Sequence, residues 1–154
     1  MTRYFDDLEL GATERFGRYK VTREEVIEFA SNYDPQLFHL EDEAASKSIF
    51  GKISASGWHT CSMMMRMQVD HWKDIGIDKA SLGGMGMDEL RWTKPVYPGD
   101  ILSCEVTLIE KKVSKSKPDR GIVKSRCKVY NQDGDIVLTM VSTGIFRSRP
   151  AIAE

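Results

Sequence analysis

The 154-residue sequence is poor in the residues that build metal centres and disulfide frameworks, with three cysteines and three histidines. The cysteines are odd in number and widely spaced, whereas a zinc site or a disulfide scaffold needs closer grouping and more partners. The histidines show no His-x3-His spacing, so we expect no bound metal. The cysteines are best interpreted as small buried hydrophobic residues: Cys61, Cys104 and Cys127.

The sequence also lacks a strong charge of either sign and a long apolar run. The formal net charge is −1, which gives no bulk attraction to nucleic acid or to an anionic membrane. No stretch has the unbroken apolar length that a bilayer requires. Residues 1–7 carry acids where a secretory signal needs basic and then apolar residues. We therefore expect no nucleic-acid partner, no membrane attachment and a cytoplasmic location.

What the sequence does contain is the composition of a globular protein, 41% hydrophobic and 29% charged. This is enough apolar material for one core, and no repeat or linker divides the chain, so we expect a single domain over 1–154. The first half reads mostly as helix and the second half mostly as strand. The pattern predicts an α+β fold.

Two helices are predicted in the first half, after a possible strand at 11–20. Thr22 to Glu25 has the capping-box pattern of a helix start, and Pro35 ends that helix at Asp34. A short helical turn is expected at 43–47, and a longer helix at 58–73. Apolar residues recur every three or four positions along the longer helix, which predicts that it is mostly buried: Trp58, Cys61, Met65, Val69 and Trp72.

Antiparallel strands are predicted in the second half, at 82–92, 102–108, 123–129 and 136–147. The last of these is apolar on both faces and is expected to be central. The basic run 111–120 is expected to be a solvated loop, or alternatively a contact for the phosphates of a nucleotide carrier. A small sheet cannot cover a buried helix or protect its own edges, so we expect a homodimer or a higher homo-oligomer.

Asp34 and His39 are the candidate catalytic pair. Their spacing alone is more typical of a helix-ending aspartate and an ordinary loop histidine. Pro35 tethers the loop, however, and a loop of this length can turn both side chains toward one point. A carboxylate and an imidazole around one water can move its proton in either direction. We expect the apolar neighbours to raise the pKa of the carboxyl or lower that of the histidine.

Ser56 and Gly57 precede the long helix and form a second candidate feature. They fit an ordinary N-cap followed by a flexible glycine. The first amides of a helix are also unpaired and positively polarised, and glycine lets a ligand approach them. Such an amide can stabilise an enolate oxygen on a thioester. Nearby, His59 is interpreted as a satisfied core histidine and His71 as structural or solvent-facing.

Several segments, taken in order, resemble the MaoC-like family of (R)-specific enoyl-CoA hydratases, which have the hot-dog fold. They run through most of the chain: Tyr33–His39, Phe50–Gly57, Gly86–Trp92, Pro95–Asp100 and Ser114–Gly121. The resemblance implies a hot-dog domain, an antiparallel sheet wrapped around a long central helix. It implies reversible hydration of a trans-2-enoyl thioester to an (R)-3-hydroxyacyl thioester, with coenzyme A as part of the substrate and no separate cofactor.

The same resemblance assigns roles within the site. Asp34 and His39 would hold and activate water, and the Gly57 amide would polarise the thioester carbonyl. Ser56, Gln36 and Trp58 complete the expected substrate site, and an acyl tunnel would run along the helix past Trp58, Met63 and Met64. Gln36 stands where the family usually has asparagine, which leaves the acyl group open.

Two alternatives remain at this point. Hot-dog proteins also hydrolyse acyl thioesters, and Asp70 on the long helix is the carboxylate available for a thioesterase. A non-catalytic acyl-thioester binding module is the other alternative.

Overall fold

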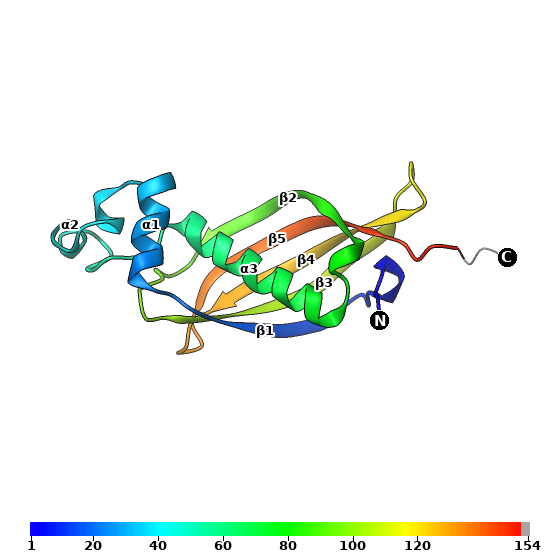
Figure 1. Cartoon of the computed structure of the whole chain (residues 1–154), viewed down its shortest axis with the longest axis horizontal. Helices are drawn as coiled ribbons and strands as arrows, with labels where there is room; N and C mark the ends of the chain where they lie inside the picture. The colour runs from blue at the N-terminus through cyan, green and yellow to red at the C-terminus, as the bar shows by residue number, and fades with distance from the viewer. Residues whose placement is uncertain (152–154) are drawn as a thin grey trace.

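The computed structural model describes residues 1–151 and shows an antiparallel sheet that curves around a long helix (Figure 1). The sheet has five strands in the order β1-β3-β4-β5-β2. Their bounds are β1 Thr13–Lys20, β2 Ser81–Trp92, β3 Ile101–Val113, β4 Arg120–Tyr130 and β5 Ile136–Arg147. The predicted α+β architecture, a sheet around a central helix, is confirmed.

Three α-helices and three 3-10 turns complete the described residues 1–151. They are η1 Phe5–Asp7, α1 Arg23–Tyr33, η2 Leu37–His39, α2 Asp42–Ser46, α3 Gly57–Ile75 and η3 Asp78–Ala80. The long helix α3 lies against one face of the sheet, while α1 and α2 gather at the end where α3 begins (Figure 1). The N-terminus and the last described residues lie at the other end of the molecule, away from α1 and α2 (Figure 1). The predicted chemistry is therefore concentrated at one end of the molecule.

Local sequence explains where α1 begins and ends. The Thr22 side chain accepts a hydrogen bond from the Glu25 amide at 3.3 Å, as an N-cap does. The reciprocal half of the predicted capping box does not form, because the two Glu25 carboxylate oxygens share the single hydrogen of the Tyr19 hydroxyl instead. At the other end, Pro35 keeps Asp34 out of the helical region, so the helix stops with Asp34 as its C-cap.

The long helix is less buried than its apolar stripe predicted. Met63, Met64 and Met67 are buried in the core, but Trp58 is 57% exposed and Met65 is 43% exposed. The reason is that α3 packs mainly over β1 and β3, on one side of the sheet. Among the described residues, no helix is both long enough and apolar enough to span a membrane.

The two edges of the sheet are β1 and β2, and β5 lies inside it as predicted. Strand β2 is exposed from Gly83 to Glu89 and its pairing with β5 shifts register at three places. Gly83 and Gly86 have nothing within 4 Å of the position that a Cβ would take. This edge is therefore open along most of its length.

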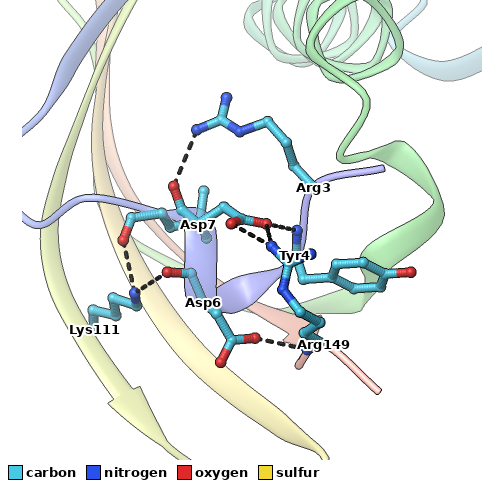
Figure 2. A network of polar contacts seen from close by, with 7 residues as sticks. Arg3, Tyr4, Asp6, Asp7, Lys111 and Arg149 are labelled. Carbon is cyan, nitrogen blue, oxygen red and sulfur yellow. Dashed lines mark hydrogen bonds and ion pairs between the residues drawn. The ribbon is translucent and has the colours of Figure 1, made fainter. Parts of the chain in front are cut away.

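The N-terminal segment is fastened to the far end of the sheet by the polar network in Figure 2. Asp7 pairs with Arg149 at 2.7 Å, and Lys111 donates to the Leu8 carbonyl at 2.7 Å and lies over the Phe5 ring. The prediction that 111–120 is a solvated loop is wrong for its first three residues, which belong to β3, and for Arg120, which begins β4. Lys111 has intramolecular partners because the N-terminal turn lies against it.

Candidate active site

Asp34 stands at the junction between α1 and the short turn η2. Its backbone amide bonds to the Ala30 carbonyl at 2.9 Å, which fixes it to the end of the helix. Its carboxylate Oδ1 accepts a hydrogen bond from Gln36 Nε2 at 2.7 Å. Gln36 is exposed, so this amide reaches the carboxylate from the solvent side. The longer side chain of glutamine thus still contacts Asp34.

His39 ends η2 and is buried, with 4% of its surface exposed. Its Nδ1 lies 2.6 Å from the Ser54 carbonyl oxygen, which can only accept, so Nδ1 carries the hydrogen. Its Nε2 lies 3.4 Å from Asp34 Oδ2. That distance is long for a direct hydrogen bond but lets one water oxygen contact both atoms. Nε2 is therefore the ring nitrogen at which a proton can be gained or lost.

Ser56 lies beside this pair at the start of α3. It is fully buried, and its hydroxyl neither caps α3 nor makes a hydrogen bond within normal limits in the described structure. It is still close enough to Asp34 to affect its ionisation. Burial raises the pKa of Asp34, but the Ser56 and Gln36 side chains and the attraction of His39 outweigh it, and the pKa lies below its usual value.

This result corrects one expectation from the sequence. Apolar neighbours were expected to raise the carboxyl pKa, whereas the polar groups that surround Asp34 lower it. The carboxylate is therefore ionised at neutral pH. A carboxylate in that state can accept a proton from water.

Gly57 is the first residue of α3, and the Trp92 indole packs against it. A Cβ at Gly57 would lie 2.7 Å from Trp92 Nε1, closer than van der Waals contact allows. The same Nε1 donates a hydrogen bond to the Gly57 carbonyl at 2.8 Å. Trp58 stacks edge-on against Trp92 with ring centroids 5.3 Å apart. Part of the reason for glycine at this position is therefore an indole, which the sequence did not reveal.

A cavity of about 1110 Å³ runs beside α3 between the helix and the sheet. Trp58 and Phe29 line the end near Gly57, and Ile77 and Phe146 line the far end. The acyl tunnel was expected to be lined by Trp58, Met63 and Met64. Trp58 and Met64 do line the cavity, but Met63 does not, because it points into the closed core, with 2% exposed.

The other histidines have separate surroundings. His59 is buried and stacks on Phe29 with centroids 4.7 Å apart, and burial lowers its pKa despite the opposing Glu25 charge. Its Nδ1 has no partner among the described residues, so the expectation of a satisfied core histidine is wrong on this point. His71 bonds Glu14 at 2.8 Å, which fits the expected structural role.

The other candidate groups are the Asp70 carboxylate, possible metal ligands and the cysteines. Asp70 pairs with Arg66 at 2.8 Å on an exposed part of α3. It lies about 20 Å along the helix from Gly57, far from the site. In the part of the chain that the structure describes, no group of three His, Cys, Asp or Glu side chains is placed to hold a metal. The three cysteines are buried and free, as predicted.

The structure brings Asp34, Gln36 and His39 into contact and sets Ser56 next to Asp34. Ser54 and Trp92 were missed as parts of this site. Ser54 acts through its backbone carbonyl, which leaves no mark on the sequence. Trp92 lies within the segment Gly86–Trp92 that resembled the family, but its contact with Gly57 depends on how β2 crosses the start of α3.

An antiparallel sheet wrapped around a long central helix is the hot-dog fold. A Mycobacterium tuberculosis protein described as having a double hotdog fold has the same fold, with a TM-score of 0.77 at 15% identity over 99% of this chain and 46% of that one. The family model for the MaoC like domain matches residues 9–130. The chain belongs to the MaoC-like family.

Three individual proteins illustrate what the chain is similar to. The MaoC-like dehydratase from Rhodospirillum rubrum is 36% identical with a TM-score of 0.87, over 97% of this chain and 99% of that one. The uncharacterised protein YdeM of Bacillus subtilis is 29% identical over 82% of this chain and 86% of its own length. The mesaconyl-CoA hydratase of Cereibacter sphaeroides is 38% identical over 52% of this chain, a match that covers 22% of that protein.

Proposed function

We propose that this protein is a hydro-lyase that interconverts trans-2-enoyl-CoA and (R)-3-hydroxyacyl-CoA thioesters. The observation that carries the proposal is the facing pair of His39 Nε2 and Asp34 Oδ2, 3.4 Å apart. When the ring is neutral, both atoms are hydrogen-bond acceptors, so a donor between them is favoured. A water molecule fits that position, and both of its hydrogens then point at the pair.

In this mechanism, the water oxygen held between Asp34 and His39 forms a bond to C3 of the enoyl group. One water proton passes to the pair, and the pair returns one proton to C2, so one water adds across the double bond. The negative charge that develops on the thioester oxygen is stabilised by the Gly57 amide at the start of α3. Dehydration is the same path in reverse.

The test is the loss of enoyl absorbance when a short trans-2-enoyl-CoA is added to the protein. Asp34→Asn and His39→Ala are each expected to lower kcat by about two to four orders of magnitude while circular dichroism stays unchanged. Asp70→Asn is the matched control, since its carboxylate is exposed and paired with Arg66. Wild-type rates in both site variants would contradict the assignment. Release of thiol from a saturated acyl-CoA would favour a thioesterase instead.

We also propose that two copies of the chain pair through strand β2. The support is the open edge of β2, where Met85 is 58% exposed and Met87 is 54% exposed, next to the exposed Trp58. Light scattering after gel filtration is expected to give twice the mass of one chain. Met87→Lys places a charge on this edge and is expected to shift the protein toward the single chain, whereas Val113→Lys, at an exposed position on β3, is not.

A further inference from the structure

Three buried side-chain atoms of the described residues have no hydrogen-bond partner, and all three lie in one short segment around the start of α3. They are Ser54 Oγ, Ser56 Oγ and His59 Nδ1. None of these residues is more than 5% exposed, so the chain itself encloses them. Buried polar atoms without partners are rare in folded proteins, and each one needs a reason. The reason is sought here in the neighbouring catalytic pair, because the Ser54 carbonyl bonds His39 of that pair.

Ser56 occupies a position at which a serine normally has a partner. It is the N-cap of α3, where a serine usually accepts a hydrogen bond from an amide in the first turn, yet its side chain makes no such bond. The residue is 0% exposed, so neither bulk solvent nor a second copy of the chain reaches its hydroxyl. Alanine would fill nearly the same volume without leaving a polar atom unpaired. The hydroxyl therefore calls for a role other than packing.

The fold places Ser56 beside the Asp34 carboxylate. His39 Nε2 lies 3.4 Å from Asp34 Oδ2, and Nδ1 of the same ring bonds the Ser54 carbonyl at 2.6 Å. The segment that continues to Ser56 is held by a backbone hydrogen bond of 2.8 Å from the Ala55 amide. Burial raises the pKa of Asp34, and the Ser56 hydroxyl is the group that lowers it most. The hydroxyl thus acts on the carboxylate although it makes no hydrogen bond to it within normal limits.

Gln36 and Ser56 reach the carboxylate of Asp34 from different sides. Gln36 is exposed and donates to Oδ1 at 2.7 Å, whereas Ser56 lies in the interior. A carboxylate that is held from one side only can rotate about its Cβ–Cγ bond and turn Oδ2 away from His39. A donor on each side prevents this rotation. The facing of Oδ2 and the imidazole is the geometry that the proposed function requires, and small misplacements of such groups cost large factors in rate.

We propose that Ser56 is a positioning residue, whose hydroxyl donates a hydrogen bond to the Asp34 carboxylate when substrate is bound and so keeps Oδ2 turned toward His39. The proposal rests on the proposed function for the role of the pair. It assigns Ser56 to the aspartate, whereas the family resemblance implied a contact with substrate. Catalytic hydrogen bonds are often long in a free enzyme and tighten when substrate binds, which agrees with a hydroxyl that is near the carboxylate but not bonded to it.

The experiment compares Ser56→Ala with the wild-type protein in the hydration of a short trans-2-enoyl-CoA across pH. Loss of a hydrogen bond to a charged group is expected to lower kcat about tenfold to a hundredfold, with KM nearly unchanged. His39 is the titratable group whose charge acts on Asp34. Because Asp34 loses a donor that stabilises its ionised form, the acid limb of the kcat profile is expected to move to higher pH.

Two further variants make the comparison specific. Ser56→Cys carries a weaker donor and is expected to move the acid limb in the same direction. It also replaces Ser56→Ala in every measurement if the alanine variant does not fold. Thr60→Val is the matched control, because it removes a hydroxyl from a residue that is 2% exposed and lies one turn further along α3. It is expected to keep the wild-type kcat and acid limb.

An NMR titration of the Asp34 carboxyl adds a measurement that needs no turnover. Its pKa is expected to be higher in Ser56→Ala than in the wild-type protein, and unchanged in Thr60→Val. A Ser56→Ala protein with wild-type kcat and an unmoved acid limb would overturn the proposal. So would a rise in KM alone, which would place Ser56 against the substrate, or an equal loss of kcat in Thr60→Val.

The failure of this proposal and the failure of the proposed function give different results. If the wild-type protein hydrates no enoyl-CoA, the proposed function fails, and the NMR titration then decides the Ser56 contact. An Asp34 pKa that is the same in Ser56→Ala as in the wild-type protein would overturn that contact, whereas a higher pKa would support it.

Discussion

Replacing Gly57 with alanine separates the two reasons for glycine at the start of α3, the packing of Trp92 and the approach of substrate. Gly57 has an ordinary helical backbone and is not among the residues with positive φ. Alanine therefore adopts the backbone without strain. The added Cβ, however, meets the Trp92 ring, with Nε1 at 2.7 Å. The indole must move.

The cost of this move can be estimated from the contacts that it breaks. The hydrogen bond from Trp92 Nε1 to the Gly57 carbonyl contributes about 1 kcal/mol. Displacing the ring adds about 1 kcal/mol, the lower end of the range for overpacking, because Trp92 is 45% exposed and can shift outward. The sum is about 2 kcal/mol, which corresponds to a Tm lower by roughly 4 to 8 °C.

The assay is a double-mutant cycle of Gly57→Ala with Trp92→Leu, measured by urea denaturation. In the Trp92→Leu background the alanine has room, so its cost is expected to fall close to zero and the coupling energy to be about 2 kcal/mol. Enoyl-CoA hydration is measured on the same four proteins. Activity that remains low in the double variant would assign Gly57 to substrate approach as well as to packing.

Additive stability effects of the two substitutions would refute the packing argument. So would a Gly57→Ala variant that is as stable as the wild-type protein. Either result would mean that the indole does not constrain this position, and that glycine is present for the ligand alone.

Two further predictions concern pH. Gln36→Leu removes a donor that helps to lower the pKa of Asp34. Since catalysis needs this carboxylate ionised, the acid limb of the kcat/KM profile is expected to move to higher pH. An acid limb that does not move would exclude the Gln36 contact as a cause of the lowered pKa. His59 has a lowered pKa because it is buried. As pH falls through about 6.5, the histidine is therefore protonated in the unfolded chain but not yet in the folded one, and the folded state loses stability. Between about pH 8 and pH 5, the Tm of His59→Phe is therefore expected to fall less than that of the wild-type protein. An equal fall in Tm in both proteins would count against a buried neutral histidine.

The order of elements and the composition of the site segment could be read from the sequence. Thr22 and Pro35 mark the two ends of α1 through local backbone chemistry, and the alternation along β3 and β4 needs no tertiary information. Asp34, Gln36 and His39 lie within one short loop, so their proximity also follows from the sequence. Local signals of this kind are reliable because each depends only on neighbouring residues.

The tertiary structure decided the features that depend on distant segments. The Ser54 carbonyl fixes the hydrogen of His39 on Nδ1, a contact with backbone that no residue type predicts. Trp92 from β2 covers Gly57, a contact between segments far apart in the chain. The pKa of Asp34 is lowered because polar groups outweigh its burial, a balance that composition cannot predict. The sequence by itself therefore determined which groups are available for chemistry. Packing determined where their protons lie and which side of Gly57 is covered, because these depend on atoms brought together only by the fold.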